Sequence, residues 1–158
     1  MRHRRLRDIA AITAGLLLLS AVTAGCTGTV RVDDRVRDEL AAGGRLVAFA
    51  EDKTNASDPI FEYEYLVLDA GPDVGGAVGH VVSHLKSKGW SEQSADDETV
   101  TMESSRWQTM AYVEHFAAFL KSWKGKGGIE PEERVADKLG SEVRSPDSLV
   151  IVKLRHFG

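Results

Sequence analysis

The 158-residue sequence has one cysteine, four prolines and no hydrophobic run long enough to cross a bilayer as a helix. With Cys26 alone, no disulfide can form within the chain, so the fold must depend on the packing of its core. The most apolar segment, residues 9–24, is shorter than the ~20 residues that a membrane-spanning helix needs. Basic residues are not in excess either, since 20 Lys and Arg stand against 24 Asp and Glu. This balance argues against a nucleic-acid partner, because such binding depends on clustered positive charge.

The first 26 residues combine a basic start, an apolar segment and three small residues before the cysteine. The basic residues are Arg2, Arg4, Arg5 and Arg7, and the small residues are Thr23, Ala24 and Gly25. This order is typical of a cleavable export signal rather than of a membrane span. It resembles the lipobox signal of bacterial lipoproteins, to which Ala24, Gly25 and Cys26 correspond. Thr23 departs from that pattern, since leucine is the commonest residue there.

The resemblance implies that residues 1–25 are removed and that Cys26 is lipidated (palmitate-type acylation), leaving the protein anchored at the outer face of the cell membrane. Cleavage after Ala24, which would give a secreted protein, is the alternative. An uncleaved anchor is a third reading, and the export route (Sec or twin-arginine) stays open. Low Ile and Asn contents beside plentiful Ala, Val, Gly and Arg resemble small lipoproteins of high-GC Gram-positive bacteria.

Three segments follow from this reading: a signal peptide over 1–25, a lipidated N-terminus and short spacer over 26–32, and one domain over 33–158. Loss of the signal removes four arginines and one aspartate, so the remaining chain is more acidic than the net charge of −4 of the full sequence. An acidic domain would not lie flat on anionic lipid, which leaves the anchor to hold it.

Hydrophobic periodicity and turn residues predict the elements of this domain. Helices are expected over 33–42, from Pro72 or Asp73 to Lys88, and over 131–139. Strands are expected over 45–50, 61–69, 98–103 and 148–155. The segment 107–120 fits either a strand or a helix, and we favour a strand that gives way to a short helix near Phe116. Because strands and helices mix without regular alternation, the predicted class is α+β, with a single mostly antiparallel sheet and helices packed on one face.

His80 and His84 are four residues apart on a predicted helix, a spacing that lets two imidazoles hold one metal ion. The glutamate of a HExxH protease motif is absent, because Val81 occupies its position. Surface histidines are the expected reading, with a metal site as the alternative. His115 and His156 end separate predicted strands and could add ligands. No cofactor is expected.

Glu62 and Glu64 point to one side of the strand over 61–69, as the paired carboxylates of a glycoside hydrolase would. A solvated strand face is the expected reading. The row of Phe61, Tyr63 and Tyr65 could stack on sugar rings, but its spacing favours a place in the core. The glycine-rich turn over 71–79 lacks the spacing of a phosphate-binding loop and is expected to be structural.

Lys121, Lys124 and Lys126 surround Trp123 in the one basic and aromatic cluster of the sequence. Trp123, Lys124 and Lys126 could contact an anionic wall polymer or lipid head groups. A solvated loop with Trp123 folded back on the domain is the expected reading.

Together these patterns predict a membrane-anchored lipoprotein outside the cytoplasm, in the cell envelope. Its expected activity is binding rather than catalysis, with a ligand, an envelope protein or a wall polymer as the partner. The alternative is a small envelope hydrolase or metal-binding protein that uses Glu62 and Glu64 or His80 and His84.

Overall fold

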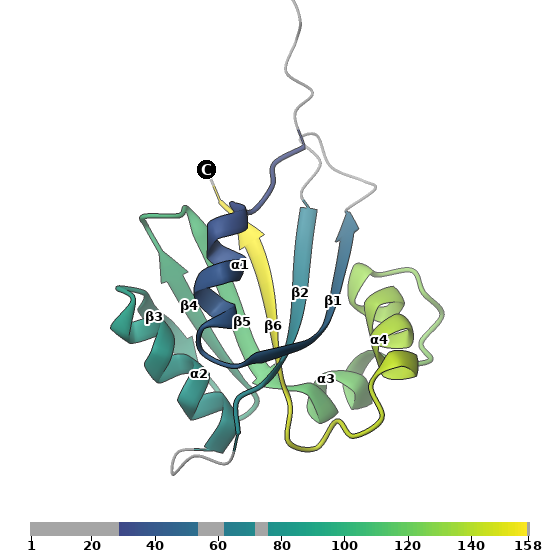
Figure 1. Ribbon diagram of the computed structural model, residues 1–158. Helices are drawn as coiled ribbons and strands as arrows, with labels where there is room; N and C mark the ends of the chain where they lie inside the picture. Colours follow the sequence, from purple (N-terminus) through teal and green to yellow (C-terminus); the bar gives the residue numbers. More distant parts are fainter. Residues whose placement is uncertain (1–28, 54–61, 72–75, 158) are drawn as a thin grey trace, which may run out of the picture.

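The computed structural model describes residues 29–53, 62–71 and 76–157, shown in Figure 1. Along the chain the elements are α1 (Asp34–Ala41), β1 (Arg45–Lys53), β2 (Glu62–Asp69), α2 (Gly76–Ser87), β3 (Ser91–Ala95), β4 (Thr99–Ser104), β5 (Thr109–His115), α3 (Phe116–Trp123), α4 (Pro131–Glu142) and β6 (Val150–His156). Among the described residues, no helix is long and apolar enough to span a membrane.

The strands form one six-stranded sheet in the order β1-β2-β6-β5-β4-β3, and every neighbouring pair is antiparallel. The predicted α+β class with a single antiparallel sheet is confirmed. The last strand, β6, lies between β2 and β5, so it joins the β1–β2 hairpin to the β3–β4–β5 meander.

Helices cover both faces of the sheet rather than one. On the first face, α1 and α2 pack on a core that includes Leu66, Val113 and Val152. On the second face, α3 and α4 pack on a separate core that includes Tyr65 and Ile151. The reason is that central strands are apolar on both sides, as the nearly continuous burial of β2 shows. The prediction of helices on one face assumed that each strand has a single apolar side, and the central strands do not fit that assumption.

The second face is only partly covered. Here α4 packs on the edge strand β1 and on α3, while α3 contacts β5 and β6 (Figure 1). Arg134 fixes α4 to β1 by donating from Nε and Nη2 to the carboxylate of Asp52, at 2.8 and 2.9 Å. Beyond these helices the same face carries the cross-strand rows Lys153–Tyr112–Thr101 and Arg155–Met110–Glu103. We call these two rows the open half of the second face.

Most predicted elements are confirmed with shifted ends. The segment 107–120 changes from strand to helix at Phe116, as favoured from the sequence. The helix from Pro131 continues past Gly140 to Glu142. Strand β3 was not expected, because all five of its residues are polar or small and exposed, and such an edge strand has no hydrophobic period.

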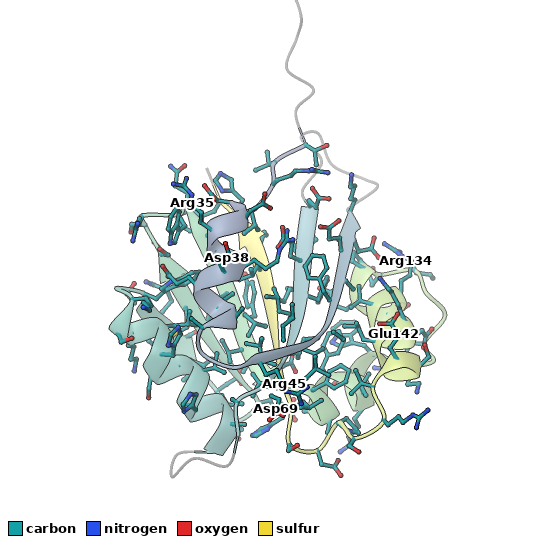
Figure 2. All side chains as sticks on the ribbon, in the orientation of Figure 1. Arg35, Asp38, Arg45, Asp69, Arg134 and Glu142 are labelled. Carbon is teal, nitrogen blue, oxygen red and sulfur yellow. The ribbon has the colours of Figure 1, made fainter. Side chains whose placement is uncertain are left out.

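Side chains fill the space between the sheet and the helices on both faces, as Figure 2 shows. The two ends of the β1–β2 pair are held by charge. At one end Arg45 donates to Asp69 at 2.9 Å, and both side chains are labelled in the figure. At the other end Lys53 lies 3.7 Å from the buried carboxylate of Glu62.

Candidate functional site

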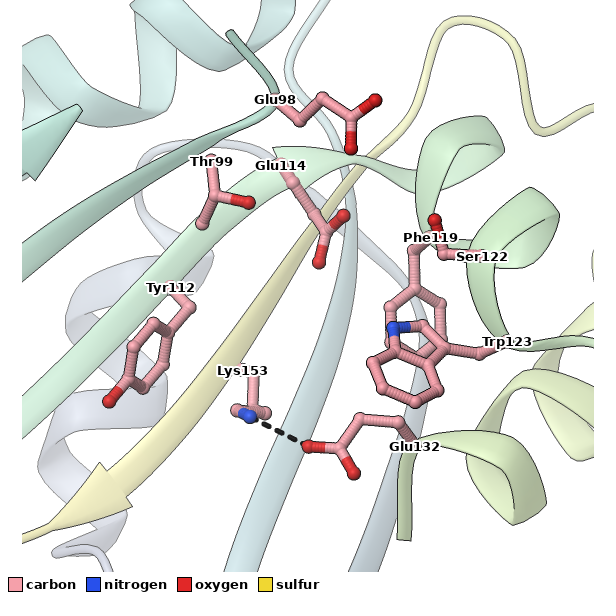
Figure 3. Close-up of a pocket in the computed structure, with 9 residues that line it drawn as sticks. All are labelled: Glu98, Thr99, Tyr112, Glu114, Phe119, Ser122, Trp123, Glu132 and Lys153. Atoms are coloured by element: carbon pink, nitrogen blue, oxygen red, sulfur yellow. Dashed lines mark hydrogen bonds and ion pairs between the residues drawn. The ribbon is translucent and has the colours of Figure 1, made fainter. Parts of the chain in front are cut away.

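A recess opens on the second face where α3 and α4 meet the strands (Figure 3). It has a volume of about 290 Å³ and brings together the β3–β4 turn, β4, β5, β6, α3 and α4. Its lining consists of Glu98, Thr99, Tyr112, Glu114, Phe119, Ser122, Trp123, Glu132 and Lys153. We call this feature the recess.

Lys153 forms the floor of the recess. It follows three buried residues of β6, and the alternation of the strand turns its side chain to the second face. Its ammonium donates to Glu132 Oε1 at 2.7 Å, the ion pair drawn in Figure 3. The same ammonium lies 4.8 Å from the ring centroid of Tyr112 and 5.3 Å from that of Tyr63. The lysine is therefore held by one carboxylate and two aromatic faces.

Glu114 lies one row along the sheet from Lys153, opposite Thr99 on β4 and Ile151 on β6. Its side chain is partly buried, and in the described part of the chain no group donates a hydrogen bond to its carboxylate. Burial raises the pKa of Glu114 to about 7. Lys153 opposes this shift, while the negative charges of Glu98, Asp96 and Glu132 add to it. Glu114 therefore titrates close to neutral pH and carries no fixed partner.

The wall opposite the strands is aromatic and comes from α3. Phe119 is buried against Tyr65 and Phe116, with ring centroids 6.1 and 6.4 Å away. Trp123, on the last turn of α3, is partly buried against the same core and borders the recess beside Phe119 (Figure 3). The prediction that Trp123 folds back on the domain is confirmed.

The lysines around Trp123 do not act as one group. Lys124 Nζ donates to the carbonyl of Gly140 at 3.2 Å, which ties it to the last turn of α4. Lys126 Nζ lies 5.7 Å from the centroid of the Trp123 ring, and Lys121 is exposed. Of the predicted surface-contact residues, only Trp123 lines the recess.

The candidate metal-binding histidines lie on the first-face side, in α2. A ring N–H of His84 donates to the carbonyl of Glu39 at 2.9 Å, and a Cβ built on Gly43 would lie 2.6 Å from His84 Cδ2. His84 thus packs α2 against the end of α1. Among the residues that the structure describes, no group of three or more His, Cys, Asp or Glu is arranged to hold a metal ion.

The other two histidines do not join this pair or each other. In the β5–β6 register His156 faces Thr109, whereas His115 faces Val150, so the two histidines stand at opposite ends of the strand pair. His115 instead borders a second, more open hollow of about 370 Å³ with Asp69, Ala77 and Asp147. These positions favour separate local roles for the histidines.

The expectation that Glu62 and Glu64 form a solvated face is wrong. Both are buried, at 3% and 4% exposure, beneath α1 and the segment before it. Arg37 of α1 donates from Nε and Nη2 to Glu64, both at 3.2 Å, while Arg31 Nε lies 2.6 Å from Glu62. Burial raises the pKa of Glu64 and the contact with Arg37 opposes that shift. Cations brought by the N-terminal part of the domain allow these carboxylates to be covered.

Several predicted residues lie outside the described part of the chain. They are Cys26 with the whole signal segment, Phe61, and part of the glycine-rich turn over 71–79. Of the aromatic row on β2, Tyr65 is fully buried and Tyr63 is partly buried against the second core, as expected for core residues.

Trp123 was singled out from the sequence, but the charged residues of the recess were not. Glu114 and Lys153 each interrupt a strand that is otherwise largely apolar, which is a usable sign of a polar group on a half-covered face. Glu132 lies in the first turn of α4, where a negative charge is favourable for local reasons alone. Its pairing with Lys153 depends on how α4 packs, and no local pattern carries that information.

The chain matches no known protein family, no curated protein and no solved structure. A function must therefore be argued from its own residues.

Proposed function

We propose that this protein is a lipid-anchored binding module that works outside the cytoplasm and takes a small-molecule ligand in the recess. Two independent features support the proposal. The lipobox-like order that ends in Cys26 supports the anchor, and the recess supports the binding activity. Nucleic acid is not among the proposed partners, because the chain is acidic.

The single observation that carries the binding activity is the composition of the recess. Ligand sites combine apolar or aromatic walls with a few polar groups that fix orientation. Here Phe119 and Trp123 supply the wall, and Glu114 and Lys153 supply polar groups that point into the same space (Figure 3). The volume of about 290 Å³ is at the lower end for such sites, so the proposed ligand is small.

The proposed activity is binding without catalysis. The carboxylates that a hydrolase would need in the alternative reading, Glu62 and Glu64, are each paired with a cation beneath α1. Neither borders the recess, and Glu64 is not joined to a histidine. No observation in the described residues favours that second function over binding.

The binding activity is tested by screening small polar compounds against the purified protein, following both thermal unfolding and heat of binding. We expect at least one compound to bind saturably and to lose about tenfold or more in affinity in Trp123→Ala. Glu103→Gln serves as the matched control, because Glu103 lies on the same face at the other end of β4. A ligand that binds equally to both variants would place the site elsewhere and contradict the proposal.

The anchor is tested by membrane fractionation of cells that express the wild type and Cys26→Ala. We expect the wild type in the membrane fraction and the variant in the soluble or precursor fraction, since one substitution removes the acylated thiol. Metabolic labelling with a fatty-acid analogue gives the second readout. No fatty-acid label on the wild type, or equal label on Cys26→Ala, would refute lipidation at Cys26.

A further inference from the structure

The lining of the recess is unbalanced in charge. It contains three carboxylates, Glu98, Glu114 and Glu132, and one ammonium, that of Lys153. These groups come from the turn before β4, from β5, from α4 and from β6, so they meet only in the folded chain. The excess negative charge lies in a partly enclosed space, where charges interact more strongly than at an open surface.

Lys153 does not neutralise the whole site, because its ammonium is already engaged. It donates to Glu132 at 2.7 Å and lies over the rings of Tyr63 and Tyr112. Its effect on Glu114 is smaller than the effect of burial, since the pKa of Glu114 stays raised. Lys153 and Glu132 therefore form a self-contained pair, which leaves the Glu114 carboxylate available.

The space beside Glu114 suits a compact group with both positive charge and carbon surface. The ring of Trp123 and the ring of Phe119 border this space (Figure 3). Aromatic faces attract organic cations, and a neighbouring carboxylate adds a direct charge contact. At about 290 Å³ the recess has room for a small ligand.

We propose that the recess binds a small organic cation, with its ammonium group against Glu114 and its carbon groups against Trp123. This inference rests on the proposed function, because it names the ligand class of the same site. In the bound state the ligand supplies a cation in direct contact with Glu114, whereas among the described residues Lys153 acts on this carboxylate without forming an ion pair with it.

Binding should depend on pH, since only the ionised form of Glu114 attracts a cation. The charged groups around Glu114 are Lys153 on β6, Glu132 on α4, and Asp96 and Glu98 in the β3–β4 turn, and the phenol of Tyr112 also lines the recess from β5. Because burial raises the pKa of Glu114 to about 7, affinity should increase as the pH rises from 6 to 8.

The test is calorimetric titration of the purified full-length protein with choline and with putrescine, which carry quaternary and primary ammonium groups. The neutral isostere of choline, 3,3-dimethyl-1-butanol, is titrated in parallel. We expect at least one of the cations to bind saturably, at least tenfold more tightly than the isostere, and more tightly at pH 8 than at pH 6. Glu114→Gln should lose tenfold or more in affinity and Glu103→Gln should lose none.

Thermal unfolding of each variant shows that it is folded before it is titrated, and the pH dependence of the wild type tests the same carboxylate without a substitution. Equal binding of cation and isostere, or full affinity in Glu114→Gln, would overturn the inference. Glucose and acetate complete the set. If either binds in a manner sensitive to Trp123→Ala while neither cation binds, the ligand class is wrong and the proposed binding function stands.

Discussion

The two faces of the sheet differ in how completely they are covered, although the same strands form both. On the first face α1 and α2 enclose a continuous apolar core that runs from β2 through β6 and β5 to Met102 of β4. On the second face α3 and α4 cover only part of the sheet. The uncovered part, the open half, carries Tyr112, Lys153 and Arg155. Both faces thus have a buried core, and the second also leaves part of the sheet and the recess uncovered.

Charged groups show the same contrast. On the first face the buried carboxylate of Glu64 has an ion-pair partner in Arg37, which also contacts Asp34 and Glu51. On the second face Glu114 is partly buried without one in the described residues. A charge that the fold pairs is a structural element, and a charge that the fold leaves unpaired at a recess is available to a ligand.

The two faces can be compared most directly by truncating one side chain on each. Leu66→Ala removes a fully buried side chain from the first core and should lower the free energy of unfolding by about 3 kcal/mol. Tyr112→Ala acts on the open half, where the surroundings include solvent, and should lower it by about 1 kcal/mol. Urea denaturation of both variants measures the difference. Equal losses would mean that the second face contributes as much as the first.

The pairing of Glu64 is tested by removing its partner. Arg37→Ala should lower the free energy of unfolding by about 2–3 kcal/mol at pH 7, because it leaves a carboxylate buried without a cation. The loss should shrink as the pH falls, since a protonated Glu64 needs no counter-charge.

The double variant Arg37→Ala with Glu64→Gln is the control for this pair. It should recover part of the loss, which a double-mutant cycle in urea would measure as coupling between the two residues. Additive effects of the two substitutions would show that Arg37 acts not through Glu64 but through its other contacts, which are the Phe49 ring, 4.5 Å from its guanidinium carbon, and the carboxylates of Asp34 and Glu51.

The third and smallest expected change in the free energy of unfolding is that of Glu114→Gln, and it is a gain rather than a loss. Its pKa is raised from 4.5 to about 7 in the folded chain, so its contribution to stability is fully present below about pH 4.5 and is lost as the pH rises through 7. Glu114→Gln removes that loss. Relative to the wild type, the variant should gain about 1–2 kcal/mol between pH 4 and pH 8, allowing for solvent screening of a partly exposed group.

Thermal or urea unfolding across this pH range gives the measurement. Parallel pH profiles of the wild type and Glu114→Gln would show that the carboxylate is as well solvated in the folded state as in the unfolded chain. In that case the contrast with Glu64 would not hold.

Much of the fold could be predicted from the sequence, because local patterns determine it. The stripe of Val32, Val36 and Leu40 is buried as its helical spacing indicates, and the change from strand to helix at Phe116 is also readable. That helices cover both faces of the sheet could not be predicted, because it depends on how the helices pack on the two sides of β2 and β6. A single strand pattern does not say which helix covers which side.

The candidate site was harder to predict than the fold. Glu62 and Glu64 alternate as residues of a solvated face would, and their burial depends on cations from Arg31, Lys53 and Arg37, which come from other segments. Glu114, Lys153 and Glu132 are far apart in the sequence, and the recess exists only because β5, β6 and α4 meet. Spacing along the chain therefore predicts helices and strands, whereas the residues that meet at the recess are determined by tertiary packing.

The central position of β6 has a consequence for the order in which the protein can be completed. Of the six strands β6 is the last to be synthesised, yet within the described sheet it is the strand that joins β2 to β5. A nascent chain that stops before Val150 has two separate strand groups, each with an apolar edge that lacks its neighbour. The six-stranded sheet can therefore be completed only after β6 has been synthesised, and a truncation that removes β6 should be far more damaging than its seven residues suggest.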